Sequence, residues 1–85
     1  MVWDETRAKR FGAALRARRE EKGLSQEALA FRAGVTKNQV QLIEAGRSSG
    51  RVEAAGPSNP RLSTLTGLAD VLGLQPSELL ELADL

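Results

Sequence analysis

The feature that most constrains the fold of this chain is the set of residues that begin and end helices in segment 23–46, which reads GLSQEALAFRAGVTKNQVQLIEAG. Ser25 is a favoured helix N-cap, and Thr36 is a second one, because Gln39 stands three residues later and completes the pattern of a capping box. The glycines that open and close the segment are suited to ending helices, since glycine enters the left-handed conformation without a steric penalty. The segment therefore predicts two short helices joined by a tight turn, over 26–33 and 37–45.

Three further helices are indicated by apolar residues at helical spacing and by Gly and Pro at their ends. The first helix of the chain has Asp4 as its N-cap and runs to Lys22. The fourth follows Pro60 and stops at Gly73, and the fifth has Pro76 at its first position. No segment shows a strand pattern. The sequence thus predicts an all-α fold, a compact five-helix bundle with the two short helices at its centre.

Composition limits the classes of function. A chain of 85 residues suffices for one domain, over 1–85. The absence of Cys and His removes the usual soft metal ligands, thiol nucleophiles and imidazole bases, so we expect no enzyme, no metal and no cofactor. No apolar run approaches the roughly 20 residues of a membrane span, and the start lacks the apolar core of a signal peptide. We expect a cytoplasmic protein with no membrane partner and no room for a domain that senses a small molecule.

Charge is distributed unevenly along the chain. All 12 Lys and Arg residues, but only seven of the 11 acidic residues, lie at or before Arg61. The front of the chain is therefore near +5 and the remainder near −4. A basic front suits a polyanionic partner, with the acidic end facing away from it. The alternative is that the arginines merely keep a small protein soluble.

The order of EEKGLSQEALA, AGVTKNQVQLIEAG and NPRLSTLTGLADVLGLQPSELL resembles the lambda repressor and Cro-like, or XRE, family of helix-turn-helix DNA-binding domains. The resemblance covers about residues 11–80. In that family the second helix of the motif lies in the DNA major groove, with its N-terminal residues on the base edges. The resemblance implies that base contacts here come from Lys37, Asn38, Gln41 and Leu42. The alternative for these residues is a solvated helix face.

The resemblance also implies contacts to the DNA backbone and a device that orients the reading helix. Backbone contacts are expected from Gln26, at the start of the first helix of the motif, and from Gln39. Gln26 can equally serve in helix capping. Arg19 and Glu44 match a pair that the family often joins as a salt bridge, which would set the angle of the reading helix.

The segment 47–59, RSSGRVEAAGPSN, is rich in Gly and Ser and predicts a loop. Relatives connect the helix that corresponds to 37–45 with the helix that follows Pro60 by a shorter segment, so the resemblance identifies residues 47–59 as containing an insertion. Arg47 and Arg51 within it are candidates for phosphate contacts. A surface insertion with no role is the alternative, because loop-closure entropy grows only slowly with length.

We expect a sequence-specific double-stranded DNA-binding transcriptional regulator that acts as a homodimer on a pseudo-palindromic operator. The predicted dimerisation helix, over about 76–85, carries more leucines than one inner face needs, and the expected contacts are Leu79, Leu82 and Leu85. Small stand-alone relatives include restriction-modification controllers, Cro-type repressors and antitoxin-like autorepressors. The alternative is a protein-interaction module that binds a toxin or a transcription partner, with DNA binding secondary.

Overall fold

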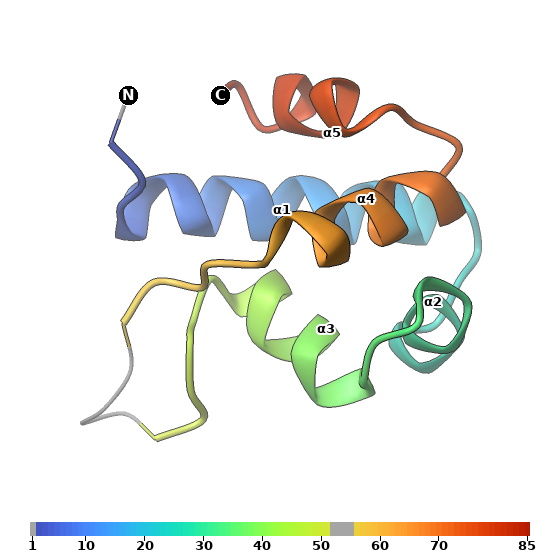
Figure 1. Ribbon diagram of the computed structural model, residues 1–85, viewed down its shortest axis with the longest axis horizontal. Helices are drawn as coiled ribbons and strands as arrows, with labels where there is room; N and C mark the ends of the chain where they lie inside the picture. Colours follow the sequence, from blue (N-terminus) through green and yellow to red (C-terminus); the bar gives the residue numbers. More distant parts are fainter. Residues whose placement is uncertain (1, 52–55) are drawn as a thin grey trace.

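The computed structural model describes residues 2–51 and 56–85, and these form five α-helices (Figure 1). The predicted all-α, five-helix fold is confirmed. Residues 52–55 of the predicted 47–59 insertion lie outside the described residues. No helix in the described ranges is long and apolar enough to span a membrane. The helices are α1 (Glu5–Glu21), α2 (Gln26–Ala33), α3 (Lys37–Ala45), α4 (Leu62–Val71) and α5 (Pro76–Leu82).

The first three helices begin at side-chain caps that the sequence predicts. The Asp4 carboxylate accepts a hydrogen bond from a backbone N–H in the first turn of α1 at 2.9 Å, and the Ser25 hydroxyl does the same for α2 at 3.0 Å. The capping box of α3 is complete: the Gln39 N–H donates to Thr36 Oγ1 at 3.1 Å, and the Gln39 side-chain oxygen accepts from the Thr36 N–H at 2.8 Å. Each cap satisfies a backbone donor that has no partner within the helix.

All five helices end in the same way. Each is followed by a residue of positive φ, and the next residue donates its N–H to the carbonyl five positions earlier. This is the Schellman arrangement, which an apolar residue packed back against the helix commonly accompanies. Such a residue follows four of the helices and packs against the core, whereas α3 is followed by Arg47. The positive-φ residues are Gly23, Gly34, Gly46, Gly73 and Asp84, and the four apolar residues are Leu24, Val35, Leu74 and Leu85.

The end of the chain differs from the prediction. The helix expected over about 76–85 stops at Leu82, and the Leu85 N–H donates to the Leu80 carbonyl at 3.1 Å. Leu85 is partly buried against the core in this cap. Helical periodicity alone could not show that the last three residues turn back on the helix, because Asp84 adopts a φ of 61° that is uncommon outside glycine.

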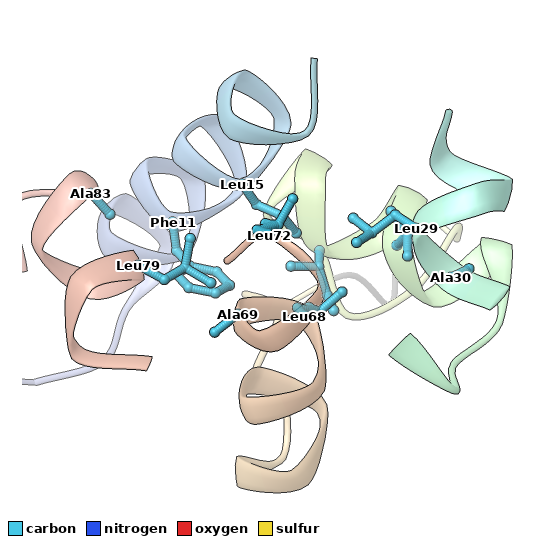
Figure 2. Packing of buried hydrophobic residues seen from close by; sticks show 11 residues of the cluster. Phe11, Leu15, Leu29, Ala30, Leu68, Ala69, Leu72, Leu79 and Ala83 are labelled. Atoms are coloured by element: carbon cyan, nitrogen blue, oxygen red, sulfur yellow. The ribbon is translucent and has the colours of Figure 1, made fainter. Parts of the chain in front are cut away.

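The core draws one or more fully buried side chains from every helix (Figure 2). α1 packs against α3 and α5, while α4 packs against α2 and α5. In Figure 1 the short pair α2 and α3 lies on one side of α1, and α5 lies on the other. The largest fully buried side chains are Phe11, Leu15, Leu29, Val40, Leu68, Leu72 and Leu79.

Gly12 lies where α1 and α3 touch, although no sequence motif marks it. A Cβ atom on Gly12 would stand 2.4 Å from the Ile43 carbonyl oxygen and 2.6 Å from that of Glu44. Both distances are far inside van der Waals contact, and both involve backbone atoms that cannot rotate away. The absence of a side chain at this position therefore allows the end of α3 to lie directly on α1.

We expect Gly12→Ala to lower the free energy of unfolding by about 1 to 3 kcal/mol, because α3 must move off α1. This runs against intrinsic propensity, which favours Ala over Gly inside a helix by about 1 kcal/mol. Denaturant unfolding measures the change. Gly50→Ala is the control: among the described residues, no atom lies within 4 Å of its Cβ position, so its effect should stay within about 0.5 kcal/mol. A more stable Gly12→Ala protein would contradict the close contact.

Candidate nucleic-acid interface

The outer face of α3 presents three polar side chains at its N-terminal end. Lys37, Asn38 and Gln41 are exposed, while Val40 and Ile43 on the opposite side of the helix are buried in the core. Lys can donate to guanine O6 and N7, and Asn or Gln can both donate to and accept from adenine. The predicted reading residues therefore share one solvent-facing surface on a helix that is anchored from behind.

Leu42 differs from the three polar residues because it is half-buried. Its side chain helps to line an open groove of about 640 Å³ between α3, the turn before it and the start of α4. Gln39 lies in the same groove, as do Arg47 and Arg61, which give it a basic lining. Leu42 thus stands at the border between the reading face and this basic groove.

A buried ion pair joins α1 to the end of α3. Arg19 Nε donates to Glu44 Oε2 at 2.6 Å, and Arg19 Nη2 donates to Glu44 Oε1 at 3.1 Å. The two side chains are 11% and 4% exposed. Arg19 Nη1 also donates to the Leu24 carbonyl at 2.7 Å, just before α2. The salt bridge that the resemblance implies is therefore present, and its two parallel bonds give it a defined geometry.

The hydrogen bond to Glu44 raises the pKa of the Arg19 guanidinium above its ordinary value, although burial acts in the opposite direction. A raised pKa of a basic group contributes stability that is present below its unfolded-state pKa and is lost as the pH rises through the folded-state pKa. For arginine both values lie at strongly alkaline pH. The guanidinium therefore stays charged, and the pair is maintained, throughout the neutral range.

Gln26 extends this pair to α2. Its side-chain Nε2 donates to Glu44 Oε1 at 3.0 Å, so Glu44 receives hydrogen bonds from α1 and from α2 at once. The sequence predicts a DNA-backbone contact or helix capping for Gln26 and gives no sign of this hydrogen bond, because no local pattern links positions 26 and 44. Gln26 is half-buried at the first residue of α2, beside the free N–H groups of that helix.

Where the predicted insertion begins and ends, its two backbone strands are paired with each other. The Ser48 N–H donates to the Gly56 carbonyl at 2.9 Å, and Arg47 and Pro57 form an antiparallel bridge. The Arg47 guanidinium donates to the Gly50 carbonyl at 3.4 Å, whereas Arg51 is exposed. The segment therefore leaves the end of α3 and returns as a narrow stem, which the composition of the loop did not indicate.

The three leucines predicted to form a dimer contact have different surroundings. Leu79 is fully buried in the core of the single chain and has no surface to offer a partner. The prediction that Leu79 forms a dimer contact is therefore wrong. Leu85 is partly buried in the terminal cap. Only Leu82 of the three is substantially exposed, at 55%. The period of α5 could not separate its inner from its outer leucines because they follow one another too closely.

We expect Glu44→Gln to lower the free energy of unfolding by about 3 kcal/mol, since it leaves the Arg19 charge buried without its partner. Glu20→Gln is a matched control. Glu20 pairs with Arg16 at 3.5 Å on the surface, and its loss should change stability by less than about 1 kcal/mol. Denaturant unfolding compares the two variants. Equal effects would mean that the buried pair contributes no more than a surface pair.

Comparisons with known proteins agree with this geometry. The family described as a helix-turn-helix domain matches residues 10–82. No curated protein sequence is a significant match. The restriction-modification controller protein C.AhdI from Aeromonas hydrophila is 36% identical, with a TM-score of 0.70, over 85% of this chain and 94% of that chain.

Two further solved structures have the same fold. The master regulator for biofilm formation SinR, solved in complex with DNA, is 30% identical, with a TM-score of 0.64, over 82% of this chain and 97% of that chain. The clp gene regulator ClgR from Corynebacterium glutamicum is 23% identical, with a TM-score of 0.75, over 92% and 72% of the two chains, and shows the fold alone. With the family match over most of its length, the chain belongs to the helix-turn-helix domain family, among the lambda repressor and Cro-like (XRE) regulators.

Proposed function

We propose that this protein is a sequence-specific double-stranded DNA-binding transcriptional regulator that acts as a homodimer on a pseudo-palindromic operator. The observation that carries the proposal is the exposed polar face of α3, with Lys37, Asn38 and Gln41, on a helix that the buried Arg19–Glu44 pair holds in place. A rigid helix with adaptable donors and acceptors at its N-terminal end suits direct readout in the major groove.

The backbone contacts of this proposal lie around the reading face. Gln26 would bring the N-terminus of α2 to one phosphate strand, where free N–H groups favour an anion. Gln39 and Arg47 line the basic groove on the other side of α3, and Arg51 extends from the stem of the insertion. Such contacts position the protein on the duplex without reading sequence. Leu42, at the border of the groove, would contact a thymine methyl group.

The dimer of this proposal uses the outer face of α5. Leu82 is exposed there, and α5 lies on the opposite side of α1 from α3, so pairing leaves the reading helices free (Figure 1). The acidic C-terminal part of the chain would then face away from DNA. Two copies related by a twofold axis would place their α3 helices in successive major grooves, about 34 Å apart.

Similarity to C.AhdI over nearly the whole of that chain supports a regulator of the controller type. The other two classes of regulator that we propose for this protein are a Cro-type repressor and an antitoxin-like autorepressor. Selection of bound duplexes from a random pool tests the proposal directly. Symmetric half-sites one helical turn apart support it, and failure to enrich any sequence refutes it. A protein-interaction module would also lack the salt-dependent affinity for random duplex that phosphate neutralisation predicts.

We expect Asn38→Ala and Gln41→Ala each to weaken binding to the selected site by about 1 to 3 kcal/mol, because a pair of hydrogen bonds to one base is lost. Binding to random duplex should barely change. Fluorescence anisotropy with labelled duplexes measures both affinities at one salt concentration. Thr6→Ala, at an exposed position on α1 outside the proposed contacts, is the control and should bind like the unmodified protein. Equal losses on both DNAs would refute base readout.

We expect Leu82→Lys to raise the dimer dissociation constant by about tenfold or more, because it places a charge in the apolar contact. The helix content should stay the same, since Leu82 lies outside the core. Sedimentation velocity across a concentration series measures the change. Leu62→Lys makes the same substitution at a leucine that is 73% exposed on α4, and it should leave the dimer intact. A Leu82→Lys protein that sediments like the unmodified one would place the interface elsewhere.

A further inference from the structure

Trp3 occupies an unusual place for a residue so close to a chain end. Its ring meets the ring of the core residue Phe11 edge to face, with centroids 6.1 Å apart and planes at 68°. The next residue, Asp4, caps α1 and also pairs with Arg7 at 3.0 Å. Trp3 is therefore held against the body of the protein by aromatic packing and by the fixed start of the helix.

The indole N–H of Trp3 connects this anchored residue to the far end of the insertion. Trp3 Nε1 donates to the Ser58 carbonyl at 2.6 Å, across 55 positions of the sequence. Ser58 is itself only 3% exposed, and its N–H donates to the Gly46 carbonyl at 3.1 Å. One buried residue thus joins the N-terminal segment to Gly46, the residue directly after α3.

The outgoing side of the insertion is fixed independently. Gly46 has a φ of 72°, and a Cβ atom there would stand 2.9 Å from the Lys9 Cα atom, so the end of α3 is pressed against α1. The Arg47 N–H donates to the Leu42 carbonyl at 2.9 Å, which directs the chain out of the helix. The end of α3 and the first backbone atoms of the insertion are therefore held against the helices.

The returning side depends on Trp3. Within the described residues, Trp3 is the only side chain outside residues 46–60 that hydrogen-bonds to this segment. The other side-chain bonds of the stem close on the segment itself, such as the one from the Gly56 N–H to Ser48 Oγ at 2.9 Å. Besides its backbone pairing with the outgoing side, the returning side is attached to the body by the bonds that meet at Ser58.

We propose that Trp3 is a positioning residue for DNA binding: it fixes the base of the insertion so that Arg47 and Arg51 meet the DNA backbone beyond the C-terminal end of α3. The inference rests on the proposed function. Arg47 begins the stem and Arg51 extends it, so their placement follows the stem. A stem that is already oriented loses less conformational entropy when it binds, and this gain appears as affinity without any contact between Trp3 and DNA.

Trp3→Phe in the full chain separates this role from packing, because Phe keeps a ring against Phe11 and removes the N–H donor. We expect faster amide hydrogen exchange at Ser58 and Ser48, with the melting temperature little changed. This readout requires no DNA. Val2→Ala is the matched control. Val2 is next to Trp3 and 73% exposed, so the amide hydrogens of this variant should exchange as in the unmodified protein. Unchanged exchange at Ser58 in Trp3→Phe overturns the proposal.

Affinity for DNA completes the test. Trp3→Phe should raise the dissociation constant for DNA by about threefold to tenfold. This is the change that corresponds to the usual net free energy of one intramolecular hydrogen bond. The loss should be similar on selected and random duplexes, because phosphate contacts carry no sequence information. Arg51→Ala should reduce affinity on both DNAs and flatten the salt dependence by about one unit. In the Arg51→Ala background the effect of Trp3→Phe should shrink, because the two residues act through one stem.

The outcomes distinguish this inference from the function on which it rests. If the unmodified protein binds duplex DNA and Trp3→Phe binds it equally well, the role of Trp3 is refuted and the proposed function stands. If the losses from Trp3→Phe and Arg51→Ala simply add, Trp3 does not act through the stem and the inference is refuted as well. If the unmodified protein binds no duplex, the proposed function itself is refuted.

Discussion

The junction between α1 and α3 is the contact on which the rest of the molecule depends. Gly12 allows the two backbones to touch, and the buried pair of Arg19 and Glu44 closes the junction farther along α1. Because Gln26 also donates to Glu44, the angle of α3 is set relative to α1 and α2 together. A helix held at its back in this way can expose its other face to solvent without losing its position, which is what recognition in a DNA groove requires.

The residues that follow the helices share one arrangement, and α3 is the exception to it. Four helices are followed by an apolar residue that returns to the core, and this residue closes the chain against the bundle. After α3 the same place is taken by Arg47, which is cationic. The chain therefore leaves the core at the end of α3, the helix with the exposed polar face of Lys37, Asn38 and Gln41, and the inserted segment begins there. Trp3 and Ser58 restore at the base of that segment the attachment that an apolar residue provides elsewhere.

Most of the secondary structure could be predicted because its causes are local. The caps at Asp4, Ser25 and Thr36 act within three residues of themselves, and the apolar spacing of α1 needs one helical period to be visible. Errors appeared where local rules leave several solutions open. Leu79, Leu82 and Leu85 look alike in the sequence, yet one lies in the core, one is exposed and one closes the terminal cap. Only the packing of α5 on α1 and α4 separates them.

The five helices, their order, the family resemblance and the exposed residues on α3 could all be predicted from the sequence. These follow from hydrogen bonds and periodicities that span a few neighbouring positions, so they can be read without a fold. Three contacts became apparent only in the folded chain: Gly12 brings α1 and α3 together, Gln26 shares Glu44 with Arg19, and Trp3 hydrogen-bonds to Ser58. Each of these contacts joins positions 18 to 55 residues apart or depends on the approach of two backbones, and no local pattern in a single sequence records such distances.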